Sequence, residues 1–382
     1  MRPATQAYEA RHLAYLHAVF ADAVALGTRD SNPKIKPDPG LWFPDGNVCI
    51  VAGDKSFRVH KGWLSLRSEP FKVQVFEAGD RSGSDVTFQG VPVYHVPDIA
   101  EDMSTLLRAI YDGRKYLQSQ APHIRFSVLS ALMRLGHKYA LADIVADATA
   151  HLEDYFTSSL TTWLQRSSGT HPAKFCLSDK DQAAGAAFEA VNLARLPGQH
   201  ALLPLALYHA CQHSPEEIVR GFARARGAGG VTVARLAPDD MVRCIDARDG
   251  LLRASHINLK DVMASVAEPC SPDCTARDAC ARNMAILYRT YVQVRWDLLT
   301  TDALAGLETQ LGALARRPCW LELCGRCRDG LVRRHRVKQR ETWWKLLDIL
   351  DLSAEELGIE WETHEGRHHA VSPQANAVGI VS

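Results

Sequence analysis

Several features that assign a chain to a common functional class are lacking in this sequence of 382 residues. Lys plus Arg and Asp plus Glu both number 44, so no net charge draws the whole chain to nucleic acid or to a membrane. No apolar run approaches the length of about 18 residues that marks a transmembrane helix. The N-terminus carries Arg2, Glu9 and Arg11 where a signal peptide has a continuous apolar segment. These absences favour a reducing compartment, the cytoplasm or the nucleus.

Catalytic signatures are absent as well. The sequence has no Walker-type loop, no His-Glu-x-x-His and no Gly-x-Ser-x-Gly. The glycine-rich stretch at 227–230 follows an expected helix and precedes an expected strand, which is the wrong order for a dinucleotide site. We therefore predict no enzymatic activity and no required cofactor.

The most distinctive stretch of the sequence is 45–71, which has the local order strand, turn, strand and helix. Residues 48–52 and 56–59 are strand-like and are joined by Gly53-Asp54, and a short helix follows. A helix from 68 to about 78, a loop over 79–90, a strand at 91–96 and a helix at 101–111 come next. Before this block we expect an amphipathic helix at 7–26 and a Pro- and Gly-containing linker or extended lead-in at 27–41.

From about residue 124 the apolar spacing becomes helical and mostly stays so. Ser214 with Glu217, and Ser353 with Glu356, have the spacing of capping boxes at helix starts. The predicted fold class is α+β, a small sheet flanked by helices, followed by a mostly all-α C-terminal region. The expected parts are an N-terminal helix and linker at 1–40, an α/β module at 41–155, a helical domain at 160–363 and a flexible tail at 364–382.

The residues of the α/β block resemble a known family. Phe57-Arg58-Val59-His60-Lys61 is similar to the second strand and following turn of the BTB/POZ domain, and Leu64, Ser68 and Phe71 follow at the spacing of that family. The stretches 106–113 and 135–139 resemble its later helices, so the resemblance covers about 110 residues, from 45 to 152. The opening 43–47 and the helical, Cys-containing C-terminal half resemble the uncharacterised BTB proteins abundant in mushroom-forming fungi.

The resemblance implies a protein–protein interaction module that forms homodimers or heteromers, with no membrane association. In some members the domain recruits cullin-based ubiquitin ligases, so an adaptor or substrate receptor for such a ligase is the leading specific form. The residues that carry the interaction or fold motif are Asn47, Phe57, His60, Lys61, Ser68, Phe71 and Tyr111.

Two departures from the family pattern limit that expectation. Asn47 stands where many members have an aspartate that lines a charged pocket, and the facing basic residue is Lys61. The sequence also has no clear apolar-x-Glu element of the kind that helps some members bind a cullin. His60 has no nucleophile nearby, so we interpret it as a residue that fixes the strand-to-helix turn by a hydrogen bond and not as a catalytic base.

Six of the ten cysteines fall in a C-terminal cluster, and three interpretations of it remain open. The first is a structural zinc site that uses Cys270, Cys274, Cys324 and Cys327, with Cys280 or Cys319 as alternates, since four thiolates can bind zinc tetrahedrally. The second is ordinary packing of free thiols. The third is a redox pair at 324 and 327, which lacks the strand-to-helix setting expected for such a motif.

A basic segment adjoins this cluster. Residues 316–340 contain nine Lys and Arg against Glu322 and Asp329, and Trp343 and Trp344 follow. The alternative function is therefore a nuclear, zinc-stapled, transcription-related factor that contacts nucleic acid through 316–344. The neutral charge of the whole chain argues against it, and a solvated helix face accounts for the same residues.

Overall fold

The computed structural model describes residues 36–81, 86–120, 124–167, 175, 177, 185–226, 230–263, 271–290 and 300–362. The expected helix at 7–26, the tail at 364–382 and two of the cysteines, Cys176 and Cys270, lie outside these residues. Among the described residues, no helix combines the length and apolar character that crossing a bilayer requires.

The described residues divide into two compact units that interleave along the sequence. The first comprises 36–156 with 185–203 and 220–237, and the second comprises 157–167, 204–219 and 238–362. Segments 185–203 and 220–237 thus lie with the first unit although they follow the boundary expected from the sequence. The domain boundaries at 155 and 160 stay a prediction.

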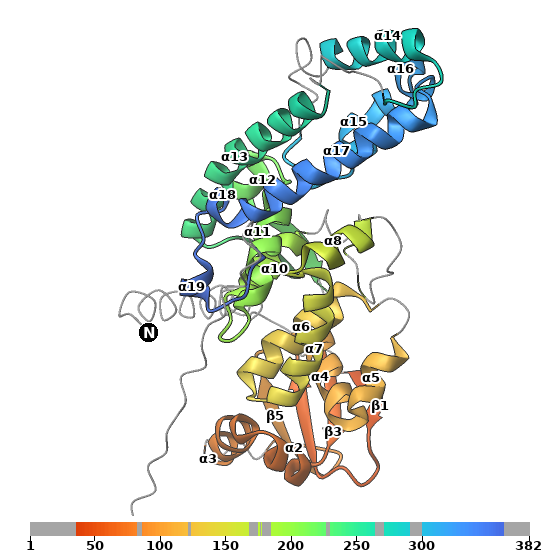
Figure 1. Ribbon diagram of the computed structural model, residues 1–382. Coiled ribbons are helices and arrows are strands. Elements are labelled where there is room, and N and C mark those ends of the chain that lie inside the picture. The colour runs from red at the N-terminus through yellow and green to blue at the C-terminus, as the bar shows by residue number, and fades with distance from the viewer. Residues whose placement is uncertain are drawn as a thin grey trace, which may run out of the picture. The chain divides into compact units, whose positions relative to one another are not determined.

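The first unit contains a five-stranded sheet with the order β1-β3-β2-β5-β4, of which Figure 1 labels β1, β3 and β5. The strands are β1 (Lys36–Trp42), β2 (Val48–Ala52), β3 (Lys55–Val59), β4 (Thr87–Phe88) and β5 (Val91–Val96). All five residues of the central strand β2 are buried. β2 pairs antiparallel with β3 through a tight turn in which Gly53 has a φ of 55°, a conformation that glycine adopts without strain. The strands expected at 48–52, 56–59 and 91–96 are confirmed.

β5 pairs in parallel with β2 on the edge opposite β3, so the chain between β3 and β5 must pass across β2, and it starts and ends at the same end of the sheet. Most of this crossover is helical and consists of α2 (Lys61–Arg67), a π-helical segment η1 (Phe71–Glu77) and α3 (Ala78–Arg81). The helix expected at 68–78 is present but extends to Arg81, into the segment that was expected to be a loop.

Four further helices complete the core of this unit (Figure 1). They are α4 (Ala100–Asp112), α5 (Arg114–Ser119), α6 (Phe126–Lys138) and α7 (Ala142–Tyr155). α4 buries Met103, Leu106, Leu107 and Ile110 on one face, at the helical spacing that the sequence predicts. The fold class, a small sheet flanked by helices, is confirmed.

The edge strand β1 is attached to α4 by one buried carboxylate. Asp38 is 7% exposed and accepts hydrogen bonds from Ser104 Oγ at 2.9 Å and Arg108 Nη2 at 2.7 Å. It also accepts the backbone N–H of Gly40 at 3.0 Å. The segment that the sequence presents as a linker or extended lead-in therefore ends in an anchored strand of the sheet.

A helix and a hairpin from later in the sequence complete the first unit. They are α10 (Ala186–Ala194), with the 3-10 turn η2 (His200–Leu202), and the antiparallel strands β6 (Phe222–Arg226) and β7 (Gly230–Ala234). Arg134 of α6 lies 3.0 Å from Asp102 and 3.4 Å from Glu189 of α10, which joins α10 to the helices of the core. The glycine-rich stretch at 227–230 follows a strand, so the helix expected before it is wrong.

The second unit is helical, as expected, and its longest elements are α13 and α17, which run side by side (Figure 1). Its helices are α8 (Leu160–Ser167), α11 (Leu203–Ala210), α12 (Pro215–Arg220), α13 (Pro238–Met263), α14 (Arg277–Tyr288), α15 (Leu307–Leu311), η6 (Gly312–Arg316), α16 (Pro318–Leu321), α17 (Gly325–Trp344), α18 (Leu346–Ile349) and α19 (Ala354–Leu357). Both predicted capping boxes form hydrogen bonds, with Glu217 N donating to Ser214 Oγ at 3.2 Å and Glu356 N to Ser353 Oγ at 3.3 Å.

Buried amides of this unit hold the irregular segment before α15 against α17. Gln339 Nε2 donates to the carbonyls of Leu304 and Ala305, both at 2.9 Å, and His335 Nε2 lies 3.2 Å from Gln310 Oε1. These hydrogen bonds satisfy buried carbonyl groups that have lost their hydrogen bonds to water.

One hydroxyl connects the start of η1 to the end of α6 in the first unit. Ser68 is 2% exposed; its Oγ donates to the Tyr139 carbonyl at 2.6 Å and accepts the Phe71 N–H at 3.1 Å. The ring of Phe71 also stacks on that of Tyr139 at a centroid distance of 4.1 Å. The hydrogen bond from Ser68 to Tyr139 joins residues that are 71 positions apart in the sequence.

We expect Ser68→Ala to lower the free energy of unfolding by about 1–3 kcal/mol, because it leaves a buried carbonyl and a buried N–H without partners. Ser65→Ala on α2 is the matched control and should change it by less than about 0.5 kcal/mol. Urea denaturation followed by circular dichroism measures both. Equal midpoints for the two variants would show that this hydroxyl does not support the fold.

Candidate functional site

Two groups of residues have the chemistry of a functional site: the surface around α2 in the first unit and the cysteines at the start of α17 in the second. At the α2 end of the first unit, Tyr111 ties the turn after β3 to α4. The backbone N–H of His60 donates to Tyr111 Oη at 3.0 Å, and Nδ1 of the same histidine lies 3.0 Å from that oxygen. His60 Nε2 lies 3.3 Å from a carboxylate oxygen of Asp45, and Phe43 contacts the Tyr111 ring. Burial raises the pKa of Tyr111, so its hydroxyl stays protonated.

The side chain of Lys61 contacts an acid that the sequence analysis did not identify. Its Nζ lies 2.7 Å from Asp80 Oδ2 and 3.2 Å from Tyr94 Oη, and the Tyr94 hydroxyl donates to Asp80 Oδ1 at 2.5 Å. The hydrogen bond with Asp80 raises the pKa of Lys61, and the same bond lowers the pKa of Asp80. Asp80 follows Lys61 by 19 residues with no local sequence signal that links them.

Asn47 accepts a backbone hydrogen bond at the start of α2. Its Oδ1 accepts the backbone N–H of Lys61 at 2.8 Å, at the first residue of α2. Asn47 therefore satisfies an N–H at the start of α2 that has no partner within the helix, while Asp80 provides the negative charge beside Lys61.

The remaining motif residues of the first unit are interior. Phe57 and Phe71 are fully buried, and Ser68 is nearly so. They stabilise the fold and are inaccessible to a partner. What α2 presents to solvent is apolar: Trp63 is 43% exposed and Leu66 is 78% exposed, three residues apart on the helix.

In the second unit, four cysteine sulfurs converge. The Sγ atoms of Cys274, Cys280, Cys324 and Cys327 all lie within 4.8 Å of one another. Three of the four predicted ligands are thus brought together, and the alternate Cys280 is the fourth member. Cys270, also predicted, lies outside the described residues.

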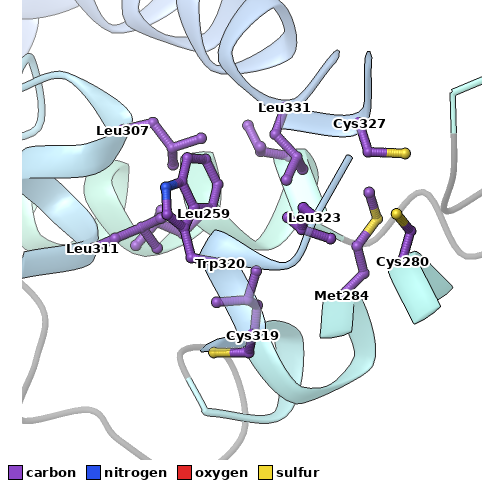
Figure 2. Close-up of a cluster of buried hydrophobic side chains, with 12 residues drawn as sticks. Leu259, Cys280, Met284, Leu307, Leu311, Cys319, Trp320, Leu323, Cys327 and Leu331 are labelled. Carbon is purple, nitrogen blue, oxygen red and sulfur yellow. The ribbon is translucent and has the colours of Figure 1, made fainter. Parts of the chain in front are cut away.

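Cys319, the other alternate, is not in this group. It is buried in the apolar cluster that α14, α16 and α17 share, and Figure 2 shows its sulfur on the opposite side of that cluster from those of Cys280 and Cys327. Spacing along the sequence could not separate Cys280 from Cys319, because the choice depends on the way α14 and α16 pack.

Local structure explains how the four sulfurs meet. Cys324 immediately precedes α17 and Cys327 lies in its first turn, so two intervening residues bring both sulfurs to the helix start. Cys280 lies in the first turn of α14, and Cys274 ends a tight turn in which its N–H donates to the Ser271 carbonyl at 3.0 Å. The predicted turn at Pro272-Asp273 is present.

Backbone N–H groups point at these sulfurs. Ser271 N donates to Cys327 Sγ at 3.4 Å, and Cys324 N donates to Cys280 Sγ at 3.3 Å. The N–H groups of Thr275 and Cys327 lower the pKa of the Cys324 thiol to about 6, whereas burial raises the pKa of Cys327. Such donors stabilise thiolate sulfur, the form that binds metal.

A positively charged side chain, that of Arg334, acts on this group of sulfurs. The positive charge of Arg334 interacts with Cys327, and its Nε is buried with no hydrogen-bond partner among the described residues. Four thiolates with one divalent ion carry a net charge of about −2. Arg334 is partly exposed, and its buried Nε, without a partner in the described part of the chain, suits a neighbour of that charge.

The basic segment lies largely on the exposed side of α17. Arg333, Arg336 and Arg340 recur at helical spacing, are exposed and form no ion pair within 4.0 Å among the described residues. Lys338 differs, because it pairs with Asp261 at 3.0 Å and with Glu341 at 2.9 Å. The three arginines are free to contact an anionic partner.

Comparison with known proteins identifies the first unit. Residues 45–155 match the family model of the BTB/POZ domain. This part of the chain is a BTB/POZ domain, and such a domain is a protein–protein interaction module. Searches of curated proteins and of solved structures give no match.

Proposed function

We propose that this protein assembles with other proteins through its BTB/POZ domain, first of all with a second copy of itself, and performs no catalysis. The observation that carries the proposal is the apolar pair on α2. Trp63 and Leu66 lie exposed on a helix of a domain whose other large apolar side chains are mostly buried. Burying a leucine of this kind contributes about 1.5–3 kcal/mol, enough to matter in an interface.

Within this proposal the interaction module comprises 41–155, and the helical region at 160–363 offers a second surface. We place the protein in the cytoplasm, the nucleus or both. Eight cysteines of the described residues are free thiols, which suits a reducing compartment.

We expect Leu66→Asp to weaken self-association at least about tenfold, since each tenfold corresponds to about 1.4 kcal/mol. Light scattering with size-exclusion chromatography over a concentration series measures it. Ile257→Asp on α13 is the control, because Ile257 is also exposed, at 52%, but lies in the second unit. A wild-type chain that stays monomeric at high concentration would remove self-association from the proposal.

The specific form that we favour is an adaptor or substrate receptor for a cullin-type ubiquitin ligase. The support for this role is the family of the domain, because some members of that family recruit cullins. Mixing the purified chain with a purified cullin separates the two forms: a stable complex supports the adaptor role, and its absence leaves self-association alone.

We also propose that the four cysteines hold a structural zinc ion. Their sulfurs form a closed set of four soft ligands, which suits Zn²⁺ and leaves no open position for catalysis. The residues fit the ion in charge as well, because the positive charge of Arg334 acts on Cys327. Bound zinc would connect the start of α17 to α14 and to the turn before it.

The purified, reduced chain should contain about one zinc ion, and Cys324→Ser should lose most of it because three thiolates bind zinc less tightly than four. Cys319→Ser is the matched control: Cys319 is buried in the same cluster but outside the sulfur group, so this variant should keep its zinc. Elemental analysis by mass spectrometry measures the content. Zinc near zero in the wild type would contradict the site.

The exposed arginines of α17 favour a second candidate, a nuclear factor that contacts nucleic acid through 316–344. Phosphate contacts of several arginines give affinity that falls steeply with salt. The zinc site at the start of this helix would hold its basic face in place.

If this second candidate is right, the chain binds duplex DNA with an affinity that falls steeply, by about tenfold or more, between 50 and 200 mM salt. Replacing Arg333, Arg336 and Arg340 together by alanine should reduce both the affinity and the salt dependence. Arg253→Ala on α13, where the arginine already pairs with Asp249, is the control. Fluorescence anisotropy with labelled duplex measures all three proteins, and binding that ignores salt contradicts the candidate.

A further inference from the structure

The four sulfurs differ in access to solvent. Cys280 is fully buried and Cys327 is 1% exposed, whereas Cys274 and Cys324 are partly exposed. The exposed pair is also close, with Cys274 Sγ and Cys324 Sγ 3.7 Å apart. The group therefore has an inner pair that solvent does not reach and an outer pair, Cys274 and Cys324, that it does.

We propose that the outer pair is an oxidation site, at which a hydroperoxide converts Cys274 and Cys324 into a disulfide and releases the bound metal. The release rests on the proposed zinc site; the disulfide does not require it. Thiolates remain nucleophilic when they bind a metal, and susceptibility to oxidation follows thiolate character and exposure. Of the four sulfurs, those of the outer pair belong to the residues that solvent reaches.

The chemistry balances with hydrogen peroxide as the oxidant. One thiolate of the outer pair attacks a peroxide oxygen; an S–O bond forms, the O–O bond breaks, and the leaving hydroxide takes a proton to become water. The second thiolate attacks the oxidised sulfur; the S–S bond forms, the S–O bond breaks, and a second hydroxide leaves as water after taking another proton. Two sulfurs are oxidised by one electron pair, the peroxide is reduced by that pair, and zinc stays divalent.

Geometry favours this pairing. A disulfide needs a sulfur separation of about 2.0 Å, so the two sulfurs must approach by less than 2 Å. Cys274 follows a turn and Cys324 precedes the first residue of α17, so neither lies inside a helix that would resist a small shift. Cys280 and Cys327 both lie within helical turns and are covered by the apolar cluster.

Loss of two ligands would leave zinc on Cys280 and Cys327 alone, which is too few thiolates to hold it as a structural ion. The connection between the start of α17 and α14 would then depend on apolar packing. The turn at 271–276 would instead be joined to α17 by a covalent bond. Oxidation by peroxide would thus replace the metal link at the start of α17 with a disulfide link.

The test uses the full chain loaded with zinc and treated with hydrogen peroxide in small steps. Zinc release is followed by a coloured chelator, and the disulfide is located by mass spectrometry of unreduced peptides. We expect about one zinc released for about one peroxide consumed, a single disulfide between Cys274 and Cys324, and recovery after a dithiol reductant and fresh zinc.

A variant that can bind zinc without forming the disulfide serves as the critical comparison. Cys274→His keeps a ligand at this position, since histidine binds zinc well, but removes one sulfur of the pair. Its zinc should be released at least about tenfold more slowly than that of the wild type. Cys319→Ser should behave as the wild type in every measurement.

The outcomes separate this proposal from the zinc site on which it rests. A chain that binds no zinc refutes the metal, and peptide mapping of that zinc-free protein still shows whether peroxide joins Cys274 to Cys324. A zinc-loaded chain that keeps its metal in excess peroxide, or forms a disulfide between other cysteines, overturns the oxidation site and leaves the zinc site intact.

Discussion

Complete burial of β2 is the constraint on which the first unit depends. A strand with all five residues inside must have partners on both edges and cover on both faces. β3 supplies one edge through the turn at Gly53, and β5 supplies the other in parallel. Because β3 and β5 lie on opposite edges of β2, the chain must pass across β2 between them, and α2, η1 and α3 make up most of this connection. The exposed face of α2 is thus a consequence of how the central strand is buried.

In the second unit, the corresponding constraint is how the N-terminal end of α17 is held in place. Its basic helix α17 has few apolar residues toward its N-terminal end, and the contacts there include sulfur. Cys327 and Leu331 pack into the cluster around Trp320, while Cys324 faces Cys274 at the margin of that cluster. A bound metal would add to this end of the helix the stability that apolar burial supplies elsewhere. Under our proposal, oxidation of the same sulfurs would remove that stability.

Much of the first unit could be predicted from sequence, because its signals are local. Strand-type residues on both sides of a glycine turn mark β2 and β3, and helical spacing marks α4. In the hairpin of β6 and β7 the second strand was expected, but the first was missed because a helix was expected before the glycine-rich stretch at 227–230. Asp80 was missed as the partner of Lys61 for another reason: the contact joins α3 to the start of α2, and no spacing rule connects residues that meet only through packing.

The cysteine group shows where that limit lies. The sequence by itself determined that thiols gather in the C-terminal third, that Cys324 and Cys327 can bind one metal ion, and that a turn precedes Cys274, because each of these depends on near neighbours in the chain. Only the tertiary structure decided that Cys280 joins them while Cys319 does not, and that two of the four sulfurs reach solvent. Those choices depend on how α14 and α16 pack against α17, a relation between distant segments that spacing does not encode.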